Sequence, residues 1–299
     1  MPSDSLLNDL RQLVTNELPA RLPNTVAFIV GSNPSQGARS PKLWNAAFKA
    51  CEIDGEMYPL DVAHKNLATV LRVLEEDPRV VGVAVAAPYK GDLAAILQPR
   101  LSSSAMRCMS INVMTRDNSG LFIGANTDGL AAVESLRELK PRFAESRMLI
   151  LGCGGTGRAV IASLLNEVRP ENLVVALRSD GHRDWLRALG IRAVSMSLEG
   201  VDLAMLGVVI NCTTIGWGAQ SDESPLTDAQ LSQLDHSCAV FDVVYQPDPT
   251  VLLRSAKTRN LRTLSGSRMN LLQAAIGFAA ANRHSDTNTV EGVMSIDEK

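Results

Sequence analysis

The sequence predicts an α/β protein built from two α/β domains, and three observations support this fold class. Over roughly the first 125 residues, short apolar runs alternate with longer helical patterns, which is typical of a parallel sheet buried on both faces. A second series of the same kind begins at Met148. The chain has 299 residues, which is enough for two domains of ordinary size.

The first half predicts strands and helices in β-α-β order. The N-terminal segment MPSDSLLNDLRQLV has the pattern of an amphipathic helix. Three apolar runs, VAFIVG, EMYPLDV and VVGVAVA, predict strands, and the segments between them predict helices near Lys42–Cys51 and Leu67–Glu75. A further helix is expected over Gly129–Leu139, where it ends before Pro141 and links the two halves.

The second half repeats this alternation. Strands are predicted at MLILG, LVVAL, AVSMS, LGVVIN and AVFDVVY. The segment MNLLQAAIGFAAAN has a helical pattern, so a helix is expected over Met269–Asn282. Arg283 and His284 follow it and suit the negative end of a helix dipole. The polar tail after Ser285 is expected to be loose.

The second series opens on a glycine-rich turn. Gly152, Gly154 and Gly157 are spaced G-x-G-x-x-G between an apolar strand and an amphipathic segment. In such a turn the first glycine allows the tight bend, the second lets the backbone approach a pyrophosphate, and the third lets helix and strand pack closely. The sequence therefore predicts a dinucleotide site here, and the alternative is a purely structural turn. The other candidate cofactor-binding residues of the turn are Gly155, Thr156 and Arg158.

The end of the next strand favours NADP over NAD. LVVAL is followed by Arg178 and Ser179, with Arg183 nearby. An NAD site usually has an acidic residue here for the ribose 2′-hydroxyl, whereas a guanidinium matches a 2′-phosphate. Asp180 is the contrary observation, because it could face the ribose if the turn were shaped differently. The alternative for both arginines is a solvated surface charge.

Composition excludes several classes of function. The net charge is −3 and aromatic residues make up 4%, so the chain has neither a basic footprint nor a base-stacking surface for nucleic acid. No apolar run approaches the roughly 20 residues that a membrane helix needs, and the N-terminus lacks the pattern of a signal peptide. We therefore expect a cytoplasmic protein with no membrane partner.

The cysteines and histidines predict no metal site. The five cysteines are scattered, and the four histidines share no ligand spacing. This pattern is typical of reduced thiols. Cys153 and Cys212 are expected to be small buried residues rather than reactive thiols.

From Phe28 to Phe278, the chain resembles the shikimate dehydrogenase family. The resemblance rests on motifs in both halves, in the family's order: GSNPSQGARSPKLWNAAF for the substrate-carboxylate loop, GVAVAAPYK, INV, GANTDG, GCGGTGRA for the cofactor turn, INCTTIGW, DVVYQPDPTVLL and SGSRMNLLQA. It implies a substrate-binding domain over residues 1–128 plus a C-terminal helix at about 267–285. It also implies a Rossmann-type NADP-binding domain over residues 129–266, with a cleft between the two.

The resemblance also implies the site residues. Lys90 and Asp128 would be the catalytic pair, because reduction of a ring ketone needs a proton at the oxygen, and a lysine held by a carboxylate can supply it. Without the flanking motifs, Lys90 would be read as a surface charge and Asp128 as a helix cap. The substrate-binding residues would be Ser40, Asn112, Tyr245 and Gln273, and further cofactor-binding residues would be Asn211, Thr213, Thr214 and Gly266. Arg39 could attract an acid, or it could be a solvated loop charge.

Departures from the family pattern cluster in the substrate site. Gly37 and Ala38 replace a histidine and a carboxylate-binding serine, Ala84 and Ala86 replace two polar side chains, and Val113 replaces a threonine. Trp217 stands where the family has a methionine near the nicotinamide. Each unpaired polar group of a substrate would lose about 1–3 kcal/mol of binding. The smaller, more apolar residues would make room for a bulkier or less polar substrate.

Three hypotheses follow. The first is an NADP-dependent oxidoreductase acting on shikimate and 3-dehydroshikimate or a close relative. The second is a divergent paralogue acting on another cyclic acid, quinate-like, aminoshikimate-like or less polar. The third is a non-catalytic NADP-binding sensor, against which the retention of Lys90, Asp128, Asn112 and Gln273 argues. In each of the first two the partner is a small cyclic hydroxy acid, and the protein is expected to be a monomer or a homodimer.

Overall fold

The computed structural model describes residues 5–282 and 286–296 and forms two compact units. The first unit contains the residues up to Thr127 and those from Leu271 onward, and the second contains Asp128–Asn270. The unit boundaries fall at the start of α6 (Asp128–Leu139) and inside α11 (Gly266–Ala281). The predicted limits and roles of the two domains stay predictions. Arg283, His284 and Ser285, which figure in the expectations above, lie outside the described residues.

The first unit contains a mixed sheet in the order β2-β1-β3-β4-β5. Its strands are β1 (Thr25–Gly31), β2 (Gly55–Asp61), β3 (Val80–Val85), β4 (Val113–Arg116) and β5 (Phe122–Ala125). β1 pairs in parallel with β2 and β3, but β4 pairs antiparallel with both β3 and β5. The expectation of a wholly parallel sheet is therefore wrong at this edge. Only residues 117–121 join β4 to β5, and so short a connection permits a hairpin but no crossover.

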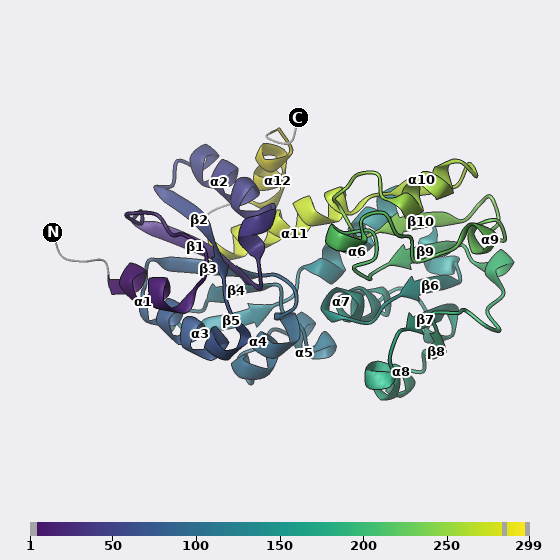
Figure 1. Ribbon diagram of the computed structural model, residues 1–299, viewed down its shortest axis with the longest axis horizontal. Coiled ribbons are helices and arrows are strands. Elements are labelled where there is room, and N and C mark those ends of the chain that lie inside the picture. Colours follow the sequence, from purple (N-terminus) through teal and green to yellow (C-terminus); the bar gives the residue numbers. More distant parts are fainter. Residues whose placement is uncertain (1–4, 283–285, 297–299) are drawn as a thin grey trace. The chain divides into compact units, whose positions relative to one another are not determined.

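Helices cover both faces of this sheet (Figure 1). On one face lie α1 (Ser5–Leu13), α3 (Leu67–Glu76) and α4 (Lys90–Leu97), and their apolar residues share a buried cluster with one side of the strands. On the other face α2 (Ser40–Ala50) and the C-terminal part of α11 form a second cluster around Trp44, Phe48 and Phe278. The short α5 (Ser103–Cys108) packs beside β5.

The expectation of a loose tail after residue 285 is wrong. The segment forms α12 (Thr287–Ile296), which packs against α2. Val290 and Met294, four residues apart, are buried in the cluster that contains Trp44. This spacing puts both side chains on one helix face. Because the residues around Val290 and Met294 are mostly polar, the sequence alone did not predict this apolar face, which is buried only against α2 and its neighbours.

The second unit contains a six-stranded sheet in the order β11-β10-β9-β6-β7-β8, and every pairing in it is parallel. Its strands are β6 (Met148–Leu151), β7 (Leu173–Leu177), β8 (Arg192–Ser195), β9 (Val208–Asn211), β10 (Ala239–Asp242) and β11 (Arg262–Leu264). This order is that of a doubly wound nucleotide-binding fold. The predicted fold class, two α/β domains with a Rossmann-type second domain, is confirmed.

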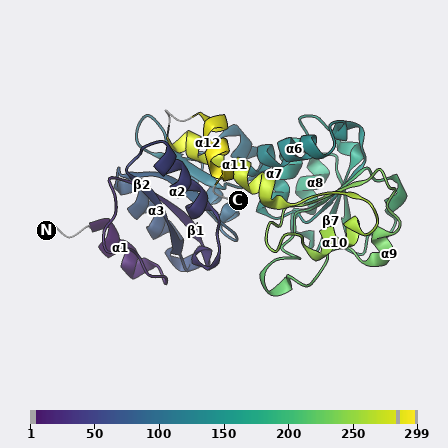
Figure 2. The ribbon, with the colours of Figure 1, turned by 90° about the horizontal axis from the view of Figure 1, so that it is seen from above.

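The helices of the second unit lie on both faces of its sheet. On one face, α9 (Asp228–Leu231) and α10 (Val251–Lys257) pack on buried leucines and valines of the central strands. On the other, α6 packs along α7 (Gly155–Leu164), as Figure 2 shows. The short α8 (Arg183–Ala188) contacts β8. Within residues 5–282 and 286–296, no helix is both long and apolar enough to cross a membrane.

Candidate active site

The glycine turn connects β6 to α7 as the sequence predicts. Gly152 has φ +92°, a conformation that favours glycine, and a side chain there would press on Thr213 and Cys212. Gly157 lies so close to the carbonyl of Gly152 that any side chain would collide with it. Gly154 has open space around it and an ordinary φ of −73°. The turn therefore has one glycine for the bend, one for close packing, and one that leaves its backbone free to be approached.

Asp128 lies beside this turn. It is buried at the start of α6, and its carboxylate accepts a hydrogen bond from the Thr156 hydroxyl at 3.3 Å. Gly129 makes this approach possible, because a side chain there would collide with Ser163 and the backbone of Ala159 on α7. The predicted catalytic carboxylate and the predicted cofactor turn are thus joined by a hydrogen bond within one unit.

Basic side chains surround the far end of the turn. Arg178 and Ser179 are exposed after β7, and Arg178 makes no hydrogen bond or ion pair with the described part of the chain. Arg183 donates to Asp180 at 2.8 Å and to the carbonyl of Ala193. Asp180, the residue that argued for NAD, is therefore already engaged by a cation.

Arg158, on the first turn of α7, supplies a second cationic side chain beside the cofactor turn. Its Nε is buried and has no hydrogen-bond partner among residues 5–282 and 286–296. Burial, and secondly the positive charge of Arg158, hold the pKa of His182 below its usual value. His182 therefore lies near the cofactor turn. The sequence had indicated no site for this histidine, because no motif includes it.

The loop after β9 carries further predicted cofactor residues. Asn211 Oδ1 accepts from the backbone N–H and the hydroxyl of Thr213, at 3.0 and 2.7 Å. Thr213 packs against Gly152, so this loop adjoins the glycine turn. Thr214 is exposed next to it. These contacts bring Asn211 and Thr213 to the same edge of the sheet as the turn.

The residues present fit a dinucleotide. The glycine turn leaves the N-terminal amides of α7 approachable, and a cationic side chain with an unused buried donor stands beside it. An unpaired guanidinium lies after the neighbouring strand, at the position that reads the ribose in this fold. An anionic, phosphate-bearing ligand matches this donor set.

In the first unit, three predicted or adjacent polar residues form one network. Asn112, which is buried, donates from Nδ2 to the Thr127 hydroxyl at 2.8 Å and to Gln273 Oε1 at 3.1 Å. Its Oδ1 accepts from the Thr127 backbone N–H at 2.8 Å, and the Thr127 hydroxyl donates to the carbonyl of Gln273 at 3.2 Å. The apolar segment LLQAAIGF of α11 thus uses Gln273 in a specific polar contact.

Lys90 adjoins this network through the backbone. It is the first residue of α4 and half-buried, and its carbonyl accepts from the N–H of Ile111, the neighbour of Asn112, at 2.9 Å. Asp128 follows directly on Thr127 in the chain. Asp128 is therefore the chain neighbour of a network residue, and Lys90 is hydrogen-bonded to the chain neighbour of Asn112.

The loop between β1 and α2 lies at the same edge of this sheet. Ser40 is buried at the first residue of α2. Ser35 donates its hydroxyl and its backbone N–H to Asp61 at the end of β2, which anchors the loop. Gly31, at the end of β1, lies against Ala86 so closely that a side chain would crowd it. The start of the loop that leads to Ser40 therefore adjoins the segment that leads to Lys90.

Four of the six positions that depart from the family pattern lie in or against one apolar cluster, and these four form the apolar wall. Ala84 and Val113 are cross-strand partners, and both are buried in the cluster with Trp44. Ala38 and Ala86 are half-buried and pack against the same cluster. The wall adjoins the Asn112 network, because Val113 follows Asn112 and the N–H of Val85 donates to the Asn112 carbonyl at 2.8 Å.

Tyr245 and Gly266 belong to the second unit. Tyr245 is half-buried after β10. Gly266 donates its N–H to the carbonyl of Val244 at 3.1 Å, and a side chain there would collide with Val243. Gly266 therefore lets α11 start against the loop that carries Tyr245.

Three residues were missed by the sequence analysis. Thr127 bridges Asn112 and Gln273, and the N-T-D-G stretch was the available signal. Asp242 and Thr250 are both buried, and the Thr250 hydroxyl donates to Asp242 Oδ2 at 2.7 Å. Both residues occur in DVVYQPDPTVLL, but a single sequence does not show that they meet.

Cys153 and Cys212 are unsuited to act as nucleophiles. Cys153 and Cys212 are buried, as predicted, and burial raises the pKa of Cys153 to about 11 and that of Cys212 further. In the described ranges, no group of three or more His, Cys, Asp or Glu side chains could hold a metal ion.

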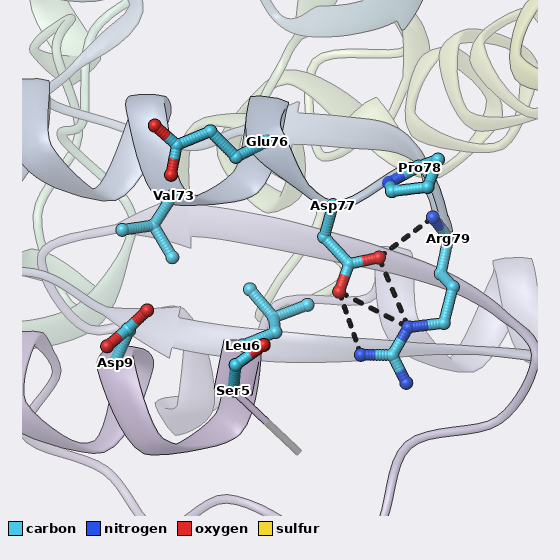
Figure 3. Close-up of a pocket in the computed structure, with 8 residues that line it drawn as sticks. All are labelled: Ser5, Leu6, Asp9, Val73, Glu76, Asp77, Pro78 and Arg79. Carbon is cyan, nitrogen blue, oxygen red and sulfur yellow. Dashed lines mark hydrogen bonds and ion pairs between the residues drawn. The ribbon is translucent and has the colours of Figure 1, made fainter.

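A surface hollow between α1 and α3 is separate from these residues (Figure 3). Its lining residues are Ser5, Leu6, Asp9, Val73, Glu76, Asp77, Pro78 and Arg79. Arg79 is paired with Asp77 at 2.8 Å within it. None of the predicted site residues lines this hollow.

Comparison with known proteins places this geometry in a family. Residues 29–114 match the family described as shikimate dehydrogenase substrate binding domain. A shikimate dehydrogenase (NADP(+)) of Bacillus licheniformis is 30% identical over 261 residues, covering 84% of this chain and 90% of that protein. The chain belongs to the shikimate dehydrogenase family. Another such enzyme in the family, from Rhodospirillum rubrum, is 33% identical over 273 residues, covering 87% of this chain and 91% of that protein.

A solved structure agrees with the family assignment. A crystal structure of a shikimate dehydrogenase in complex with NADP⁺ matches with a TM-score of 0.80 and 26% identity. The match covers 95% of this chain and 99% of that one. The likeness therefore includes both units, so the family fold is present over nearly the whole chain.

Proposed function

We propose that the protein is an NADP-dependent oxidoreductase that interconverts the ring alcohol and ketone of shikimate and 3-dehydroshikimate or a related cyclic acid. The observation that carries this proposal is the Asn112–Thr127–Gln273 network. The Lys90 carbonyl accepts a hydrogen bond from Ile111, the neighbour of Asn112, and Asp128 follows Thr127 in the chain. Its donors and acceptors suit the hydroxyls of a small ring. The names of the relatives, shikimate dehydrogenase (NADP(+)), agree with it.

Lys90 and Asp128 divide the proton chemistry. During ketone reduction the Lys90 ammonium donates a proton to the ring oxygen, and during alcohol oxidation the amine accepts it. The Asp128 carboxylate accepts a hydrogen bond from the same hydroxyl and orients it. Thr156, which donates to Asp128, fixes the carboxylate beside the cofactor turn. Asn112 and Gln273 bind the neighbouring hydroxyls, and Ser40 binds the carboxylate.

The cofactor is held by the second unit. The α7 amides around Gly154 bind the pyrophosphate, Arg158 supplies its free Nε–H to a phosphate, and Arg178 and Ser179 bind the 2′-phosphate. When bound, NADPH would supply the hydride for ketone reduction, and NADP⁺ would accept it in alcohol oxidation. Arg183 contributes by neutralising Asp180, which would otherwise repel that phosphate.

The apolar wall favours a second candidate substrate. Ala38, Ala84, Ala86 and Val113 provide no hydrogen-bonding side chain where the family pattern has polar ones. A cyclic acid with fewer hydroxyls, or a bulkier one, would suit this surface better than shikimate, because it would leave fewer polar groups unpaired. The same catalytic residues would serve it.

The deciding experiment is an oxidation assay with the purified protein. Shikimate, quinate and a panel of cyclic hydroxy acids are offered with NADP and with NAD, and nicotinamide absorbance is followed. Rapid turnover of shikimate with NADP supports the first candidate, and turnover restricted to less hydroxylated acids supports the second. NADPH binding without turnover of any compound would contradict both and favour a sensor.

A variant separates catalysis from binding. Lys90→Ala should bind NADPH normally and lose about 10²- to 10⁴-fold of its turnover, because the proton donor is gone. Lys65→Ala, at an exposed lysine of the same unit, is the matched control and should keep wild-type turnover. Equal activity of Lys90→Ala and wild type would refute the assigned role.

A further inference from the structure

Trp217 is a large apolar side chain presented to solvent beside the proposed cofactor site. It lies in the loop after β9, and 53% of its surface is exposed. Gly216 and Gly218 flank it with φ +102° and +59°, values that favour glycine. Its N–H donates to the Thr214 carbonyl, and its own carbonyl accepts from the N–H of Gln220. These two bonds fix the backbone of the loop, and the indole is exposed to solvent.

A buried polar network anchors that loop. Asn211 Nδ2 donates to the Ile215 carbonyl at 3.1 Å and to Asp242 Oδ1 at 2.9 Å. The Ile215 N–H donates to the Thr213 hydroxyl at 3.1 Å. Gly216 packs against the Thr250 side chain. The two residues before Trp217 are therefore tied to β9, β10 and the start of α10.

The centre of the network is a buried carboxylate. Asp242 accepts from Asn211, from the Val244 N–H at 3.0 Å and from the Thr250 hydroxyl at 2.7 Å. Asp242, Asn211 and Thr250 are almost wholly buried. Burying a carboxylate is costly even with three donors. All three donors come from β9 or from the segment after β10, so what this arrangement achieves is to fix those segments relative to each other.

The sheet order places the loop at the nicotinamide end of the cofactor. A dinucleotide crosses such a sheet at the turn after β6, with its adenosine over the strand that follows and its other half over the strand on the opposite side. Arg178 marks the adenosine side after β7, and β9 is the opposite neighbour of β6. The loop of Trp217 follows β9.

We propose that Trp217 packs its indole against the nicotinamide ring and favours the oxidised form, and that the Asn211–Asp242–Thr250 network positions it. Oxidised nicotinamide carries a positive charge and the reduced ring is neutral. An indole face attracts a cation more strongly than a neutral ring. Trp217 would therefore bind NADP⁺ more tightly relative to NADPH. This inference rests on the proposed function.

The first test measures binding, not turnover. Dissociation constants of NADP⁺ and NADPH are determined by calorimetry for wild type, Trp217→Leu and Trp217→Phe. Trp217→Leu should weaken NADP⁺ binding by about 3- to 30-fold and NADPH binding less, with Trp217→Phe in between. A loss of equal size for both cofactors, or no loss, would overturn the cation contact.

The second test concerns positioning. In a Trp185→Phe background the remaining tryptophans are Trp217 and Trp44, which is buried in the core of the first unit. Quenching of the emission by NADP⁺, beyond that seen in a Trp185→Phe, Trp217→Phe protein, therefore reports on the loop. Thr250→Val should shift the emission of the free protein and reduce the preference for NADP⁺, whereas Thr250→Ser, which keeps the hydroxyl, should restore both. Identical spectra and binding ratios in Val and Ser variants of equal helix content would overturn the positioning role.

The outcomes separate this inference from the proposed function. Failure of the wild type to bind either cofactor would contradict the NADP assignment and this inference together. Tight binding of both cofactors, with a ratio that Trp217→Leu leaves unchanged, would overturn only the role of Trp217.

Discussion

At the scale of single residues, we propose that the charges after β7 set the preference between NADP and NAD. Arg178 is exposed and free of partners in the described structure, whereas Arg183 is engaged with Asp180. A guanidinium without a partner can form two charge-assisted bonds to a phosphate. Because Asp180 is paired, its carboxylate is poorly placed to serve the 2′-hydroxyl of NAD.

Arg178→Ala should weaken NADP⁺ binding by roughly 10- to 100-fold and leave NAD⁺ binding unchanged, since charge-assisted bonds contribute about 1.5–3 kcal/mol. Calorimetric titration with both cofactors measures this. Arg187→Ala, an exposed arginine of α8 paired with Asp184, is the control and should change neither constant. Equal losses for both cofactors would sink the 2′-phosphate assignment.

The titration of Asp242 gives a prediction for stability. Burial raises its pKa from 3.8 to about 6, only partly offset by the donors that favour the charged form. The folded protein therefore holds this proton more tightly than the unfolded chain. The resulting stabilisation is complete below pH 4 and is lost as the pH rises through 6. Its size is on the order of 3 kcal/mol.

Asp242→Asn should remove this pH dependence. Denaturant unfolding is measured from pH 4.5 to 7.5, and the wild type should lose more stability over that range than the variant. The variant is expected to be less stable overall, because its amide cannot accept all three hydrogen bonds. Parallel curves for the two proteins would show that Asp242 has an ordinary pKa.

At the scale of elements, the β6–α7 turn assigns different tasks to its glycines. Gly157 has no room for a side chain, because the Gly152 carbonyl lies against it. Gly154 has room, and an alanine fits its backbone angles. We therefore expect Gly157 to matter for folding and Gly154 to matter for the ligand.

Gly157→Ala should destabilise the protein by about 1–3 kcal/mol or more, because the new methyl forces helix and strand apart. Gly154→Ala should leave the melting temperature of the free protein nearly unchanged and weaken NADP⁺ binding, because the methyl stands where the pyrophosphate approaches. Thermal melts with and without NADP⁺ separate the two effects. A destabilised free Gly154→Ala protein would contradict this division.

At the scale of the whole molecule, the first unit depends on segments from both ends of the sequence. Residues from α11 and α12 complete the cluster around Trp44 and Phe48. Phe278 packs edge-on against Trp44 and Phe48, with ring centroids 5.3 and 4.9 Å apart. The C-terminal segments are thus part of the unit's core.

Met294→Ala should destabilise the first unit by about 2–4 kcal/mol, because it opens a cavity in a fully buried position. Gly292→Ala, on the exposed side of α12, is the matched control and should be neutral or stabilise by up to about 1 kcal/mol. Urea unfolding measures both. Equal stability of Met294→Ala and wild type would mean that α12 contributes nothing to the core.

The sequence by itself determined the fold class, the glycine turn, and the identity of most candidate site residues. These features depend on local patterns: the period of apolar residues, glycine spacing and short motifs. It also marked Ala38, Ala84, Ala86 and Val113 as departures. The candidate roles of all these residues stay predictions until variants are measured.

Only the tertiary structure decided which distant residues meet. Asn112 and Gln273 are 161 positions apart, and Asn211 and Asp242 are 31 apart, yet each pair shares a hydrogen bond. The antiparallel direction of β4 and the burial of α12 likewise could not be predicted from the sequence, because strand direction and helix burial depend on partners elsewhere in the chain. Local sequence fixes what each segment tends to become, whereas the burial of apolar surface and the pairing of buried polar groups select its neighbours.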